Sequence, residues 1–104
     1  MKMMTKELEG KIPSLNKLEE LDNPLSIIHY FHAFGAGDWY VIAGDKQENG
    51  DWLFYGYVKS PLGAMFDEFG TFTLNELTSV KKFGVNAIER DLYWEEVPIN
   101  EIIK

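Results

Sequence analysis

Residues 39–59, WYVIAGDKQENGDWLFYGYVK, decide the fold class, because two runs rich in aromatic and β-branched residues flank a turn sequence. Such residues favour strands. Asn49-Gly50 between the runs is typical of a two-residue hairpin turn, whose central residues both need positive φ. The stretch therefore predicts an antiparallel hairpin of two strands, residues 39–46 and 52–59.

Both faces of this predicted hairpin are apolar. With Asn49-Gly50 as the turn, one face carries Tyr40, Ile42, Lys46, Leu53, Tyr55 and Tyr57, and the other carries Trp39, Val41, Ala43, Trp52, Phe54 and Val58. A sheet with one face in solvent would alternate apolar with polar residues instead. We therefore expect helices to cover both sides, or one aromatic face to be a contact surface.

Strand and helix signals continue on either side of the hairpin. Residues 26–34 and 69–72 are strand-like, and residues 88–94 are expected to be extended or irregular. Capping and turn residues predict three short helices, with starts or ends at Thr5, Pro13, Thr73, Gly84 and Pro98. The pattern predicts a single α+β domain over residues 1–104, an antiparallel β-meander of three to four strands flanked by short helices.

Composition narrows the classes of function. The chain has 104 residues and no cysteine, which excludes a disulfide scaffold, a thiolate metal site and a cysteine nucleophile. Its net charge of −7 disfavours direct binding to nucleic acid. No apolar stretch has the length of a signal peptide or a membrane span. We expect a cytoplasmic protein with no membrane partner.

The candidate catalytic residues are Glu89 and Asp91, joined by Asp67 and Glu68. Two acids on either side of Arg90 could hold a divalent cation such as magnesium or manganese. The alternative is that both carboxylates clamp Arg90 and tie the C-terminal segment to the sheet. We favour the clamp, because no histidine or lysine accompanies the acidic pair in the sequence.

Two other patterns imitate metal sites and are set aside. His29 and His32 lie three residues apart in a predicted strand, so their side chains should point to opposite faces as sheet or rim histidines. Residues 45–50 resemble the start of a calcium loop, but Gln47 stands where the pattern has aspartate or asparagine, and Gly56 stands where it has a bidentate glutamate. The sequence predicts no metal site and no cofactor, unless the carboxylates act with magnesium or manganese.

Aromatic residues offer a candidate binding surface. The tryptophans and tyrosines could stack on bases, but few basic residues accompany them, and core packing explains most of them better. The face left uncovered, beside residues 89–91, gives candidate binding residues Trp39, Tyr55, Tyr57, Arg90 and Trp94.

Four sequence blocks resemble a known family. They are Asp38-Trp39-Tyr40-Val41, Phe54-Tyr55-Gly56-Tyr57-Val58, residues 68–77 (EFGTFTLNEL) and residues 88–94 (IERDLYW). In this order they resemble an uncharacterised bacterial "domain of unknown function" family, number twenty-nine fifty-eight, from about Thr5 to Ile103. The chain departs from the family at Ala43-Gly44, where an acid is frequent, and at Tyr55, where a second phenylalanine is frequent.

The resemblance implies an accessory protein of a mobile element or phage, with no assigned catalytic residues. We expect a non-catalytic, acidic protein-interaction module that meets a basic face of another protein through exposed aromatic residues. One alternative is a metal-dependent nuclease acting on single-stranded DNA. Another is a structural homo-oligomer whose apolar second face pairs with its own copy.

Overall fold

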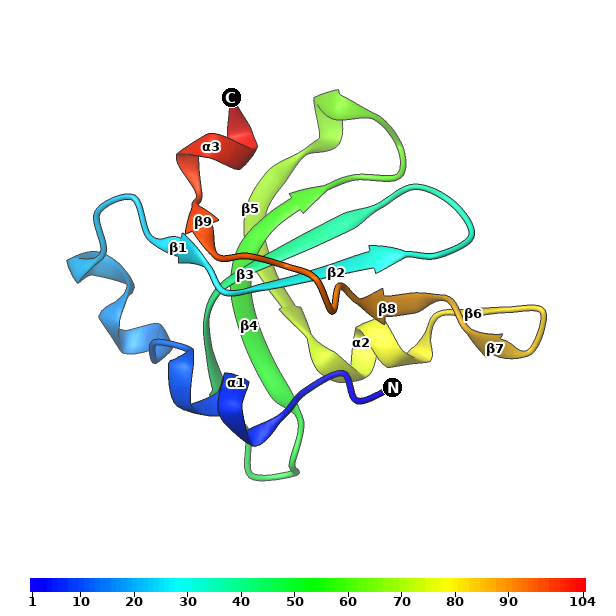
Figure 1. The fold of residues 1–104 in the computed structure, drawn as a ribbon, viewed down its shortest axis with the longest axis horizontal. Helices are drawn as coiled ribbons and strands as arrows, with labels where there is room; N and C mark the ends of the chain where they lie inside the picture. Colours follow the sequence, from blue (N-terminus) through cyan, green and yellow to red (C-terminus); the bar gives the residue numbers. More distant parts are fainter.

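The computed structural model describes residues 1–104, and its centre is a five-stranded antiparallel sheet of order β5-β4-β3-β2-β8. The strands are β2 (Ile28–His32), β3 (Asp38–Lys46), β4 (Trp52–Lys59), β5 (Glu68–Thr73) and β8 (Ile88–Arg90). The first four form a meander in chain order, and the chain then returns to lay β8 beside β2 (Figure 1). The α+β class and the meander are confirmed, and the segment expected to be extended or irregular supplies a fifth strand.

Two pairs of two-residue strands lie outside this sheet. β1 (Leu25–Ser26) pairs with β9 (Val97–Pro98), and β6 (Lys81–Lys82) pairs with β7 (Val85–Asn86). Two predictions were wrong here. Gly84 does not end a helix but forms, with Phe83, the turn between β6 and β7, where both residues have positive φ. Pro98 does not begin the last helix, because it lies in β9.

The helices are short and lie on both sides of the sheet (Figure 1). Thr5 and Thr73 cap their helices as predicted, because their hydroxyl oxygens accept hydrogen bonds from the Leu8 and Glu76 amides. None of the helices has the length and apolar character needed to cross a membrane. The helical segments are α1 (Lys6–Lys11), α2 (Leu74–Ser79), α3 (Asn100–Ile103) and the 3-10 turns η1 (Leu15–Glu20) and η2 (Ala64–Phe66).

Each face of the sheet has its own core. On the first face, α1 and α2 help to cover a cluster of buried residues, namely Ile27, Ile28, Tyr30, Val41, Trp52, Phe54, Phe72, Leu77 and Ile88. On the second face, η1, β9 and α3 help to cover a smaller cluster, namely Tyr40, Ile42, Ala43, Ile99 and Ile102. Of the two alternatives that the sequence left open, the structure shows coverage on both sides, although Tyr55 and Tyr57 of the second face stay partly exposed.

The β3–β4 hairpin differs from the prediction at its turn. The Gln47 amide donates to the Asp51 carbonyl at 2.7 Å, so three residues form the loop, and only Gly50 has positive φ. Lys46 consequently pairs with Trp52 and lies on the first face, not the second. The Asp51 amide donates to the Asn49 side chain at 3.0 Å, which stabilises this wider turn.

A β-bulge between Val41 and Ala43 shifts the register by one more residue in the same direction. It moves Ala43 to the second face, contrary to the prediction. From Tyr40 back to the start of β3 the side chains keep their predicted faces, but their partners differ by two residues: Tyr40 pairs with Tyr57, where a two-residue turn would pair it with Lys59. Gly56 faces the bulge, and a Cβ atom there would lie 1.9 Å from the Tyr40 carbonyl oxygen. The close approach of the two strands therefore requires glycine at this position.

Candidate functional site

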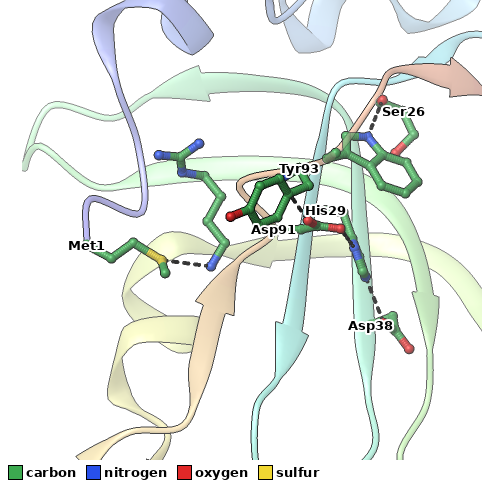
Figure 2. A network of polar contacts seen from close by, with 8 residues as sticks. Met1, Ser26, His29, Asp38, Asp91 and Tyr93 are labelled. Carbon is green, nitrogen blue, oxygen red and sulfur yellow. Dashed lines mark hydrogen bonds and ion pairs between the residues drawn. The ribbon is translucent and has the colours of Figure 1, made fainter.

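His29 is the centre of the most developed polar cluster in the molecule. Its Nε2 atom lies 2.7 Å from Asp38 Oδ1, and its Nδ1 atom lies 2.9 Å from Asp91 Oδ2. Figure 2 shows the ring between the two carboxylates, which come from the start of β3 and from the residue after β8. The cluster thereby joins three segments that are distant in the sequence.

The strand register explains how these residues meet. Asp38 pairs with Phe31, which places it diagonally across from His29 on the neighbouring strand. The Asp91 amide donates to the His29 carbonyl at 2.8 Å, so β8 leads the carboxylate directly to the ring. Cross-strand neighbours at such positions are within reach of one another's side chains.

Hydrogen-bond counting shows how the cluster is satisfied. Each contact of the ring needs one proton, but a neutral imidazole carries only one. Both contacts are therefore made either by a positively charged ring between two carboxylates or by a neutral ring beside a protonated acid. The side chain of His29 is only 13% exposed, whereas those of Asp38 and Asp91 are 34% and 27% exposed.

Aromatic rings enclose the histidine. The His29 ring stacks on Tyr40 with centroids 4.6 Å apart, and Trp94 lies 5.0 Å away at a tilt. The Trp94 indole donates to the Ser26 carbonyl at 2.9 Å, which fixes its position. The Lys59 ammonium lies 5.8 Å from the centre of the Tyr40 ring.

Burial and the nearby carboxylates act on Tyr40. Burial, followed by the negative charges of Asp38 and Asp91, raises the pKa of the Tyr40 hydroxyl to about 12. Burial also raises the pKa of Tyr30, on the first face of the sheet. Both phenols stay protonated at neutral pH and can act there as hydrogen-bond donors but not as bases.

The cluster lies at the side of a shallow hollow of about 460 Å³. The hollow is lined by His29, Phe31, His32, Asp38, Asp91 and the 35–37 turn. The His32 Nδ1 atom accepts a hydrogen bond from the Phe34 amide at 3.1 Å. His32 is therefore a rim residue, as expected.

Few groups in the hollow are free for chemistry. Both nitrogens of His29 face carboxylates, and the second oxygen of Asp91 accepts from the Tyr93 amide at 3.0 Å. A general base must reach the proton that it abstracts, and both nitrogens of His29 are already engaged with carboxylates, while each oxygen of Asp91 already accepts one hydrogen bond. The arrangement is better suited to holding β2, β3 and the segment after β8 together than to catalysis.

The structure does not bring the predicted catalytic carboxylates together. One row of paired residues crosses all five strands of the sheet, from Glu68 through Val58, Trp39 and Tyr30 to Arg90. Four strand spacings of ~4.8 Å therefore put Glu68 about 19 Å from Arg90.

The four acids also have different surroundings. Asp67 accepts from the Ser60 amide at 2.7 Å in the β4–β5 connection, whereas Glu89 pairs with Phe31 and its carboxylate has no hydrogen-bond or ion-pair partner. Asp91 is bound to His29. No three acidic or histidine side chains are arranged to hold a metal ion.

We expected the carboxylates of Glu89 and Asp91 to clamp Arg90, and the structure shows that they do not. The Arg90 Nε atom donates to the Lys2 carbonyl at 2.9 Å, and the Arg90 amide lies 3.3 Å from the Met1 sulfur. Neither Glu89 nor Asp91 forms an ion pair with it. Arg90 therefore fastens the N-terminal segment along β8, because its side chain leaves the first face of the sheet beside Tyr30.

The predicted binding aromatics are divided between the two faces. Trp39 packs against the core of the first face, whereas Tyr55, Tyr57 and Trp94 pack against that of the second. Trp94 contributes to the surroundings of His29, while Tyr55 and Tyr57 contact Phe69 of β5. The five candidates, including Arg90, therefore do not form one surface.

Sequence reasoning missed His29 and Asp38 as partners. The available signal was the Gly35-Ala36-Gly37 turn, which folds Asp38 back toward the strand that carries His29. The contribution of Asp91 was not visible in this way, because it depends on β8 pairing with β2.

Comparison with known proteins identifies the family. No curated protein and no solved structure matches the chain. A family model described as "Protein of unknown function (DUF2958)" matches residues 3–103 and confirms the resemblance seen in the sequence blocks. The chain therefore belongs to this DUF2958 family, an uncharacterised domain family.

Proposed function

We propose that the protein is a non-catalytic protein-interaction module that binds another protein through one end of its sheet. We call this the loop end and define it by residues 33–37, residues 60–67 and the β6–β7 hairpin, residues 81–86. The pairs Asp38–Lys59 and His32–Ile88 show that these connections leave the sheet at the same end. All three lie on the right of Figure 1, the 60–67 connection toward the top.

Exposed apolar side chains at the loop end carry this proposal. Met65 and Phe83 are 86% and 85% exposed. Isolated exposed apolar residues are ordinary, but their concentration at one end of a small domain is typical of an interaction surface. The exposed large apolar side chains of the loop end are Phe34, Leu62, Met65, Phe66, Phe83 and Val85.

The loop end carries few charged side chains, which favours an apolar contact there. The charged side chains of the loop end are Lys81, Lys82 and Asp67, so the whole negative excess of the chain comes from its other residues. A basic partner would be attracted by those other residues and anchored by the apolar side chains of the loop end. We therefore expect salt to slow association while changing dissociation little.

The site geometry favours this function over the nuclease alternative. The candidate carboxylates lie at opposite edges of the sheet, and His29 and Asp91 are engaged with each other. The family resemblance extends the proposal to an accessory role in a mobile element or phage, with a host protein or a protein of the element as the partner.

A comparative pull-down from host-cell lysate tests the proposal. The baits are the native protein, a Leu62→Ser/Phe83→Ser variant and a matched Leu92→Ser/Tyr93→Ser variant, whose residues are also exposed but lie outside the loop end. We expect the native and control baits to recover the same protein and the loop-end variant to lose it at least about tenfold. Equal recovery by the loop-end variant, or no partner with any bait, would contradict the proposal.

Two further measurements address the alternatives. Purified protein incubated with single-stranded DNA and magnesium or manganese should leave the DNA intact, whereas cleavage that disappears in Asp91→Ala would favour a nuclease. Light scattering at micromolar concentration should give the monomer mass, whereas a dimer would favour the homo-oligomer.

A further inference from the structure

The outer edge of β5 is an open edge of the sheet. β5 is an end strand, and β4 is its only partner in the sheet. No backbone hydrogen bond of a turn, loop or cap involves residues 68–72. In an antiparallel strand, alternate residues direct their N–H and C=O groups away from the paired neighbour. About half of β5 therefore presents unpaired backbone groups to solvent.

The opposite edge of the sheet is covered. β8 has only three residues, and Arg90 holds the N-terminal segment against it through Met1 and Lys2. β5 is twice as long and contains neither proline, lysine nor a bulge, the features that commonly prevent a strand from pairing at an edge. Only the edge at β5 is thus available for another strand.

An apolar groove of about 460 Å³ borders this edge on the second face. Phe69 of β5 forms one side of it, is 40% exposed and stacks on Tyr55 with centroids 6.1 Å apart. The remaining apolar side chains of the groove come from η1, the η1–β1 connection, β3, β4 and the residue before α3, and are Leu18, Leu21, Pro24, Ile42, Tyr55 and Ile99.

We propose that the β5 edge and this groove form a strand-addition site for an extended segment of another protein that alternates apolar and basic residues. The backbone of the segment would pair with the free groups of β5, and an apolar side chain would enter the groove. This surface is separate from the loop end, and the proposal goes beyond the interaction proposed above.

Charge identifies the segment as basic. Glu19 is the charged residue of the groove lining, and no lysine or arginine lines it. The carboxylates of Glu19 and Glu68 have no hydrogen-bond or ion-pair partner in the protein. A second copy of the chain, itself of charge −7, would bring like charges together at this edge, whereas lysines or arginines of a foreign segment would complement them.

Peptide binding to the full chain tests the proposal. The probe is a short labelled peptide that alternates lysine with valine, and its controls are the same peptide with glutamate for lysine and one with proline at alternate positions. We expect anisotropy to report binding of the lysine peptide alone, and hydrogen exchange of outward β5 amides to slow at least about tenfold on binding.

Charge-reversal variants locate the site. Glu19→Lys/Glu68→Lys should weaken the lysine peptide about tenfold, whereas Glu48→Lys/Glu95→Lys, which makes the same change in net charge elsewhere, should weaken it much less. Any one of four results would overturn the proposal. The lysine peptide does not bind, the proline peptide binds equally well, the two charge-reversal variants have equal effects, or the β5 edges of two copies pair with each other. Leu62→Ser/Phe83→Ser should bind the peptide like the native protein, which separates this site from the loop end.

Discussion

Replacing His29 with alanine should destabilise the fold strongly, because the ring joins three segments. The substitution removes contacts of 2.7 and 2.9 Å to Asp38 and Asp91 and a stack of 4.6 Å on Tyr40. Charge-assisted hydrogen bonds contribute about 1.5–3 kcal/mol each when buried, and less for carboxylates that are partly exposed. With the lost stacking, the free energy of unfolding should fall by about 3 kcal/mol.

Urea denaturation and thermal melting measure this change. A loss of about 3 kcal/mol corresponds to a fall of roughly 10–20 °C in Tm for a domain of this size. His32→Ala is the matched control on the same strand, because the His32 ring accepts a single hydrogen bond, from the exposed Phe34 amide. That control should change stability by less than about 1 kcal/mol.

A double-mutant cycle distinguishes this network from simple loss of packing. In the native background, where residue 38 faces the His29 ring, Asp38→Asn should lower the free energy of unfolding by about 1 kcal/mol. In the His29→Ala background it should cost nothing, because two carboxylates no longer have a donor between them. An equal cost of Asp38→Asn in both backgrounds, or a loss below about 0.5 kcal/mol for His29→Ala, would refute the reasoning.

Three further predictions concern the sheet and its buried groups. Gly56→Ala should cost about 3 kcal/mol in denaturation, because its Cβ would lie 1.9 Å from a carbonyl oxygen, whereas Gly70→Ala on the paired position has open space and should be near neutral. Equal effects of the two would argue against the bulge. Ser26→Ala should raise stability by up to about 1 kcal/mol, because the buried Ser26 hydroxyl has no partner; a clear loss would show that it has one. Burial raises the pKa of Tyr40 to about 12 and also raises the pKa of Tyr30. The contribution of the two protonated phenols to the free energy of unfolding is therefore complete below about pH 10 and lost as pH rises through 12. A free energy of unfolding that stays unchanged over that pH range would contradict this prediction.

Features with local causes could be predicted from the sequence. The caps at Thr5 and Thr73 depend on residues within one helical turn, and both form as expected. The aromatic strands and the apolar character of both faces follow from alternation over a few residues. The hairpin register was less accessible, because a wider turn and a β-bulge each shift it by one residue in the same direction. At the far end of β3 the partners therefore differ from the predicted ones by two residues, while the side chains keep their predicted faces.

The polar site required contacts that short segments do not determine. His29, Asp38 and Asp91 meet because β8 pairs with β2, and that pairing depends on burial of Ile88 in the first core. The charge pattern around Arg90 suggested a local clamp instead. The carboxylate of Asp91 faces His29, and Arg90 binds the N-terminal segment, because strand alternation separates the two side chains.

Photo-crosslinking in cells tests the interaction function most directly. A photoreactive phenylalanine analogue is placed at Phe83 of the loop end or at Tyr93 outside it, two aromatic positions that are 85% and 93% exposed. The proposed function predicts one specific crosslinked protein from position 83, lost in the Leu62→Ser background, and none from position 93. Absence of a crosslink from position 83, or the same products from both positions, would contradict it.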